Sequence, residues 1–190
     1  MRHGSALLTA TVAAIVVLAG CQSKKSDTSG SGADLLGKAT GTVAGVKWTV
    51  PGRWTAQAER PMRVATYTVP AAEGDQEGAE CVVSFFGSGQ GGPVEMNIDR
   101  WKGQFENPEE SARNSEEVNG VPVTTVELAG TYLAPGGPMM QSTGKKEGAR
   151  LLGAVITAPE GMVFFKMTGP SKTVEAGRKE FHAMVKSLSK

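Results

Sequence analysis

Alternating apolar and polar residues run through most of the chain after residue 43 and predict strands. Six segments alternate in this way: 45–51, 63–70, 80–86, 121–134, 150–158 and 162–169. A period of two is typical of strands that bury one face. Pro159, Glu160 and Gly161 separate the last two segments, and this turn composition predicts a hairpin. Gly130 interrupts the longest segment and indicates a bulge or a bend.

A helical period occurs twice and predicts helices over residues 93–106 and 173–188. We expect Asn107 and Pro108 to end the first helix and Thr173 to cap the second. The apolar stripe of the first helix consists of Val94, Ile98, Trp101 and Phe105. The expected buried face of the second consists of Phe181, Met184, Val185 and Leu188. Trp101 lies in the middle of its stripe, so we expect its indole to pack on the sheet.

Two strand segments carry apolar side chains on both faces. Phe85 and Phe86 are adjacent, as are Phe164 and Phe165, and adjacent side chains in a strand point to opposite faces. Such a sheet is covered on both sides. We therefore expect residues 43–190 to form a single α+β domain. Its architecture would be a central antiparallel sheet of about six strands flanked by helices, an α/β/α sandwich.

The first twenty residues are typical of an export signal. Ala6 to Gly20 carry no charge, and this apolar stretch is shorter than the ~20 residues of a membrane-spanning helix. Leu18-Ala19-Gly20-Cys21 follows the pattern of a lipobox, so these residues resemble a bacterial lipoprotein signal. The resemblance implies cleavage before Cys21 and acylation of its thiol, with palmitate among the chains attached. Two or three acyl chains hold a protein firmly at a membrane.

The lipobox implies an exported protein of the cell envelope, anchored by lipid to a bacterial membrane. Gln22 follows the cysteine, and in enteric-type sorting this favours the periplasmic face of the outer membrane. Residues 21–42 are rich in Ser, Gly and Lys and are expected to form a flexible tether. Removal of residues 1–20 takes away Arg2, which leaves 19 Lys and Arg against 19 Asp and Glu. A neutral chain gives no support to binding of nucleic acid.

Few residues are available for metal binding or nucleophilic catalysis. The cleaved chain contains one histidine, His182, and one cysteine besides Cys21, namely Cys81. Structural zinc sites need more ligands of this kind. Cys81 lies in an alternating segment and is expected to be a buried, unreactive thiol. His182 has basic neighbours at helical spacing, and we do not expect it to be catalytic. We expect no cofactor, no metal and no enzymatic activity.

The glycine-rich segment 87–92 is a candidate phosphate loop. Gly87, Gly89 and Gly92 have the spacing G-x-G-x-x-G between a strand and a helix, where dinucleotides bind. Two features favour a plain strand-to-helix connection instead. Pro93 lacks an amide proton, and residues 106–117 contain no apolar run that would form the next strand of a βαβ unit.

A polar stripe on the first helix is a second candidate for binding. Asn97, Arg100 and Gln104 follow one another at helical spacing beside the apolar seam. All three side chains form directed hydrogen bonds. They could contact a partner or ligand, or they could form an ordinary solvated face.

Residues 45–190 resemble the PsbP-like fold in layout. The resemblance rests on "VPGRW" at residues 50–54, the strand-rich middle, the mid-chain helix and the final helix after "FKMTGP". PsbP proteins of photosystems and a Ran-binding relative share this fold, and it implies binding or assembly more than catalysis. We therefore expect a membrane-anchored binding or assembly module with an unidentified protein partner. A ligand-binding lipoprotein that uses the glycine loop is the alternative, and an enzyme ranks third.

Overall fold

The computed structural model describes Met1, residues 35–134 and residues 144–190. The expected signal peptide, Cys21 and Gln22 lie outside the described residues, as does most of the expected tether.

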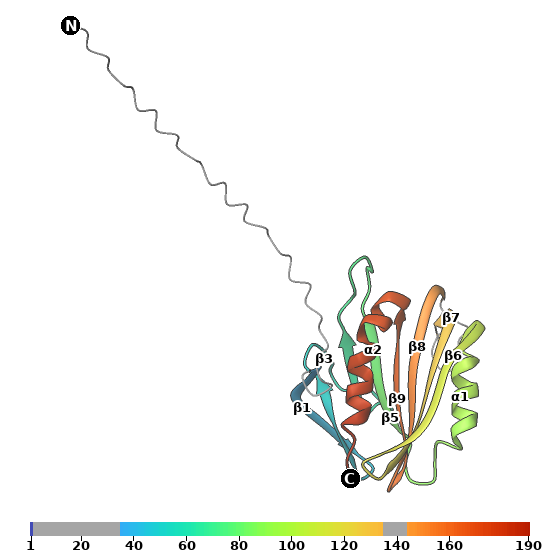
Figure 1. Cartoon of the computed structure of the whole chain (residues 1–190). Helices are drawn as coiled ribbons and strands as arrows, with labels where there is room; N and C mark the ends of the chain where they lie inside the picture. Colours follow the sequence, from blue (N-terminus) through green and yellow to red (C-terminus); the bar gives the residue numbers. More distant parts are fainter. Residues whose placement is uncertain (2–34, 135–143) are drawn as a thin grey trace.

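One antiparallel sheet of seven strands forms the centre of the domain (Figure 1). Its strands are β3 (Thr55–Ala56), β4 (Ala65–Val69), β5 (Ala79–Phe85), β6 (Phe105–Val118), β7 (Val121–Ala134), β8 (Gly144–Ala158) and β9 (Gly161–Pro170). Their spatial order is β3-β4-β5-β9-β8-β7-β6. The expected hairpin is confirmed, since Ala158 pairs with Gly161 across a two-residue turn. The register shifts next to Gly130, where we expected a bulge or a bend.

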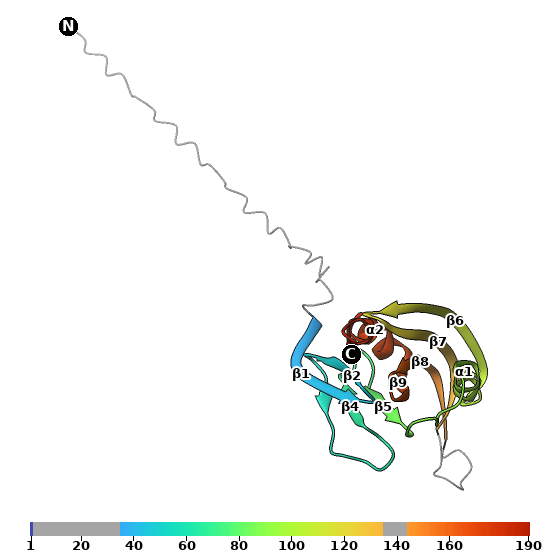
Figure 2. The same cartoon turned by 90° about the horizontal axis from the view of Figure 1, so that it is seen from below.

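One helix packs on each face of this sheet, as the α+β prediction required (Figure 2). Helix α2 (Ser171–Lys186) buries its apolar face on the core that contains Phe165, and helix α1 (Val94–Lys102) covers the core that contains Phe164. The buried face of α2 is confirmed at Phe181, Met184 and Val185, and Leu188 just beyond it is also buried. Among the described residues, neither helix has the length and apolar composition needed to span a membrane.

Strands β1 (Leu36–Val43) and β2 (Val46–Pro51) form a separate two-stranded sheet. The segment 45–51 was expected in the central sheet, and the tether was expected to run to residue 42, so both assignments are corrected. The indole of Trp48 in β2 packs edge-on against Phe165, with ring centroids 5.2 Å apart. Glycine at position 41 allows β1 to lie on that indole, since a Cβ there would lie 2.1 Å from Cζ2 of Trp48.

Strand β6 is the clearest error of the sequence prediction. Residues 106–117 carry no apolar run, yet they form most of a 14-residue strand at the edge of the sheet. Nearly all of its side chains are exposed, so burial imposes no apolar alternation on them. Its charges are typical of an edge strand that resists pairing with other chains. Pro108 is accommodated because the register of β6 against β7 shifts between Glu106 and Glu109.

Both helices also begin or end at other residues than expected. Helix α1 ends at Lys102, so Phe105 lies in β6 and not on the helix. Helix α2 begins at Ser171, and Thr173 lies inside its first turn. The cap comes from a distant loop, because Asp75 Oδ2 accepts hydrogen bonds from the Thr173 amide at 2.9 Å and from its hydroxyl at 2.7 Å.

Candidate functional site

A groove lies on the sheet face that α1 covers only in part. Helix α1 packs against β6, β7 and β8 and reaches β9 at Phe164, and this leaves open the same face of β5 and of β9 from Lys166 onward. The space beside the helix has a volume of about 840 Å³. Its floor is formed by Glu80, Val82 and Ser84 of β5 and by Phe164, Lys166 and Thr168 of β9. The strand period places these alternate residues in the groove, whereas Cys81, Val83 and Phe165 belong to the core under α2.

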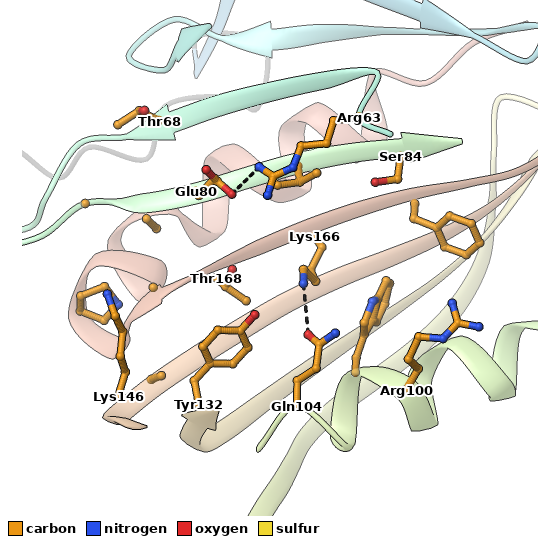
Figure 3. A pocket seen from close by; sticks show the side chains of 18 of the residues that line it. Arg63, Thr68, Glu80, Ser84, Arg100, Gln104, Tyr132, Lys146, Lys166 and Thr168 are labelled. Atoms are coloured by element: carbon orange, nitrogen blue, oxygen red, sulfur yellow. Dashed lines mark hydrogen bonds and ion pairs between the residues drawn. The ribbon is translucent and has the colours of Figure 1, made fainter. Parts of the chain in front are cut away.

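Lys166 lies at the centre of the groove (Figure 3). Its Nζ donates a hydrogen bond to Gln104 Oε1 at 3.1 Å. The pKa of Lys166 is lowered to about 8, mainly by burial and also by the nearby Arg63, whereas Glu80 has a smaller, opposite effect. Among the described residues, no carboxylate lies within 4.0 Å of this ammonium group. Lys166 is therefore a partly buried cation without an ionic partner in the described part of the chain.

The carboxylate of Glu80 is already bonded to two arginines. Arg63 Nη1 donates to Glu80 Oε1 at 2.6 Å, and Arg60 Nη1 lies 3.4 Å from Oε2. Arg63 and Arg60 come from the connection between β3 and β4, which forms one wall of the groove. These two ion pairs hold Glu80 toward that wall and away from the ammonium group of Lys166 (Figure 3).

The three polar residues expected on α1 all line the groove, with different roles. Asn97 is 2 % exposed, and its Nδ2 donates to the carbonyl oxygens of Gly91 at 2.6 Å and of Pro93 at 2.9 Å. Asn97 Oδ1 accepts a hydrogen bond from Arg100 at 3.0 Å. Arg100 is exposed and, within the described ranges, has no carboxylate within 4.0 Å. Gln104 follows the helix in the chain, and its Oε1 accepts the hydrogen bond from Lys166.

The glycine-rich segment lies beside the groove, between β5 and α1. Gly87, Gly89 and Gly92 all have positive φ angles, which glycine adopts at little cost. The carbonyl oxygens of Gly91 and Gly92 accept hydrogen bonds from Asn97, so the side chain of this buried residue fastens the turn. A strand does follow α1, but β9, β8 and β7 separate it from β5. A dinucleotide-binding unit would place these two strands side by side, so the topology differs from that unit.

Aromatic side chains form one end of the groove. The ring of Phe164 lies 5.6 Å from that of Phe86 and 6.5 Å from that of Trp101, measured between centroids. Trp101 is 6 % exposed and packs on the sheet as expected. Two apolar side chains are exposed at the rim: Met62 is 79 % exposed and Phe86 is 42 % exposed. Met62 also has a φ of 62°, a left-handed conformation that is strained for this residue type.

Other reactive groups lie away from this groove. Cys81 is fully buried, as expected, and burial raises the pKa of its thiol. His182 Nε2 lies 3.6 Å from Glu127 Oε1 on the face of the sheet that α2 covers. No group of three or more His, Cys, Asp or Glu side chains in the described part of the chain could hold a metal ion.

Sequence reasoning did not select Lys166, Arg63 or Glu80. One signal was available for Lys166, because it is the single charged residue in the strand "GMVFFKMTGP". A lysine in a strand that is apolar on both faces must lie in a gap of the covering layer. For Arg63 and Glu80 the sequence offers no such signal, since charged residues near strand ends are usually solvated.

Comparisons with known proteins concern the backbone arrangement. The chain is similar to a protein of unknown function from Pseudomonas aeruginosa, with 12% identity, a TM-score of 0.46 and coverage of 78% of this chain and 94% of the other. It is also similar to a cyanobacterial PsbP from Synechocystis sp., with 12% identity, a TM-score of 0.48 and coverage of 76% of this chain and 86% of the other. A third similar structure is the Saccharomyces cerevisiae Ran-binding protein Mog1p, with 9% identity, a TM-score of 0.49 and coverage of 80% of this chain and 95% of the other. No family model matches the sequence, and neither does any curated protein.

Proposed function

We propose that this protein is a lipid-anchored binding module of the bacterial cell envelope and that its groove holds a small organic ligand. The observation that supports binding is the groove itself, which combines aromatic walls with an ammonium group that no carboxylate of residues 35–134 or 144–190 pairs with. Its volume of about 840 Å³ falls within the range of small-molecule sites, roughly 300–1,000 Å³. Apolar walls with a few placed polar groups are typical of such sites.

The groove places ligand binding ahead of capture of a protein partner, which the sequence analysis had ranked first. A ligand-binding lipoprotein was the alternative, with the glycine loop as its site. The groove beside that loop is now the better candidate, because β6 does not lie next to β5 as a dinucleotide-binding unit requires and Pro93 offers no amide proton to a phosphate. Arg100 and Gln104 keep the binding role that we expected from their spacing. Asn97 has a structural role, because it bonds the glycine-rich turn and accepts a hydrogen bond from Arg100. A protein partner would contact the exposed rim, where the side chains of Met62 and Phe86 lie.

Binding in the groove is tested with N-phenyl-1-naphthylamine, a neutral dye whose emission rises in apolar surroundings. We expect the domain to bind the dye and Ser84→Trp to abolish the binding, because the indole would fill the groove from its floor. Thr42→Trp adds the same side chain to an exposed position on β1 and should leave dye binding unchanged. Equal dye binding by both variants would place the dye elsewhere and contradict the proposal.

Anchoring through Cys21 is tested separately. We expect Cys21→Ser to abolish labelling of the protein by radioactive palmitate in cells and to leave an uncleaved precursor. The wild-type chain should fractionate with membranes, and its distribution between inner and outer membranes tests the preference drawn from Gln22. Continued labelling of the serine variant would rule out Cys21 as the acylated residue.

A further inference from the structure

We infer that the groove selects an amphiphilic carboxylic acid, with its carboxylate against Lys166 and its apolar body along the aromatic end of the groove; this rests on the proposed function. Lys166 would distinguish such an acid from a neutral molecule of the same shape. Three properties of the groove support it: its charge balance, the isolation of Lys166 and the position of the aromatic rings.

The charged residues of the groove leave positive charge unpaired. Four cations line it, Arg63, Arg100, Lys146 and Lys166, against three carboxylates, Glu77, Glu80 and Glu147. Arg63 is bonded to Glu80, and Lys146 is bonded to Glu77 at 2.5 Å. Among the residues that the structure describes, Lys166 and Arg100 then have no carboxylate partner and Glu147 has no cationic partner, which leaves one net positive charge in the groove.

Lys166 is the cation for which an anionic ligand matters most. An unpaired charge removed from water is costly, and the lowered pKa of Lys166 reflects this cost. A ligand carboxylate would restore the missing partner and form a charge-assisted hydrogen bond. A single buried ammonium group matches the single negative charge of a carboxylate. Arg100 lies at the exposed edge, where solvent screens its charge.

The apolar part of the ligand has a defined direction from Lys166. Phe164 precedes Lys166 by two residues on the same strand face, a separation of about 6.6 Å along β9. Trp101 packs edge-on against Phe164, and Phe86 continues this aromatic surface to the rim. At the other end lie Tyr132 and Lys146, a more polar surface (Figure 3). An acid that binds Lys166 therefore has apolar surface beside it on one side only.

Three probes with the same chain separate charge from apolar contact. Dodecanoate and dodecyltrimethylammonium below their micelle-forming concentrations, and dodecanol below its solubility limit, are used to displace the neutral dye. We expect dodecanoate to bind about tenfold to a hundredfold more tightly than dodecanol, the effect of one hydrogen bond to a charged group. The cationic probe should bind most weakly. Equal affinity for the acid and the alcohol would overturn the inference and leave the proposed binding function intact. Failure of the dye itself to bind would overturn both.

Variants then test whether Lys166 provides the selectivity. Lys166→Met keeps an unbranched side chain without the charge, so it should bring the affinity for dodecanoate down to that for dodecanol and leave dodecanol unaffected. Lys179→Met removes an exposed lysine from α2 on the opposite face and should change neither affinity. A Lys166→Met protein that still prefers the acid would overturn the inference, as would an equal loss in both variants.

A third measurement requires no variant. Acetic anhydride acylates neutral amines, and mass spectrometry reports the extent of labelling at each lysine. Saturating dodecanoate should reduce labelling of Lys166 more than saturating dodecanol does, because the carboxylate stabilises the protonated amine. Labelling of Lys179 should stay the same with either probe. Equal protection of Lys166 by acid and alcohol would contradict a carboxylate at this position.

Discussion

The indole of Trp101 lies directly on Gly153 of β8, and no side chain would fit between them. A Cβ built at Gly153 would lie 2.2 Å from Cζ3 of Trp101. This close approach holds α1 against the sheet. The same helix carries Arg100, and Gln104 follows it, so the contact also sets the wall of the groove.

Trp101→Ala is expected to destabilise the domain strongly. Removal of an aromatic side chain from a core costs about 3–5 kcal/mol, whereas a domain of this kind has only ~5–15 kcal/mol in total. Urea unfolding followed by circular dichroism measures the difference. The control is Asp99→Ala on the exposed side of the helix, which should change the free energy of unfolding by less than ~0.5 kcal/mol. A stable Trp101→Ala protein together with an unfolded Asp99→Ala protein would reverse the orientation that we assign to α1.

Asn97→Ala is expected to lower stability by about 1–3 kcal/mol, because the carbonyl oxygens of Gly91 and Pro93 would lose the donor that the buried Asn97 side chain provides. Asn97→Asp should be destabilising as well, since a carboxylate cannot donate to these carbonyl oxygens. Asp99→Ala, on the exposed face of the same helix, serves as the control. If Asn97→Ala unfolds at the same urea concentration as the Asp99 variant, Asn97 does not support the site in the way we describe.

Asp75→Ala is expected to destabilise the domain by ~1 kcal/mol, the usual cost of removing a helix cap. Asp75 binds the backbone amide of Thr173 from a loop almost one hundred positions earlier, so its loss leaves the first turn of α2 without this acceptor. Thermal unfolding measures the effect. Glu73→Ala removes an exposed acid from the same loop and should leave the melting temperature unchanged. Equal melting temperatures for the two variants would exclude Asp75 as the cap.

Lys166→Met is expected to stabilise the ligand-free domain by about 1 kcal/mol or more at neutral pH. The substitution removes a partly buried charge that has no carboxylate partner among the described side chains, and it retains apolar packing. In a domain of this size such a change raises the melting temperature by roughly 2–4 °C. Greater stability combined with lost affinity for the acid would be typical of a functional residue that is retained at a cost to folding. A lower melting temperature would mean that Lys166 supports the fold.

The pH dependence of stability should also differ in this variant. The pKa of Lys166 is lowered from 10.5 to about 8 in the folded protein, so between these values the unfolded chain binds more protons. The free energy of unfolding contributed by Lys166 therefore rises as the pH rises through this window. Subtracting the pH profile of Lys166→Met from that of the wild type isolates this contribution, because the other titrating groups are shared. Parallel profiles would show that the pKa is not lowered.

The sequence by itself determined the elements that bury a face. Alternation predicted β4, β5, β7, β8 and β9, and helical spacing predicted α1 and α2, because a shared core imposes its period on whatever packs against it. The adjacent pairs Phe85–Phe86 and Phe164–Phe165 predicted a sheet covered on both sides for the same reason. The burial of Cys81 and Trp101 followed from their places in these patterns.

Only the tertiary structure decided the edge strand of the sheet, the cap of α2 and the position of the candidate site. Strand β6 has almost no buried side chains, so its pairing with β7 does not require alternating apolar residues in its sequence. The cap from Asp75 to Thr173 joins residues far apart in the chain, which local spacing cannot reveal. Lys166 becomes a candidate site residue only because α1 is too short to cover β9, and that depends on how two separate elements pack.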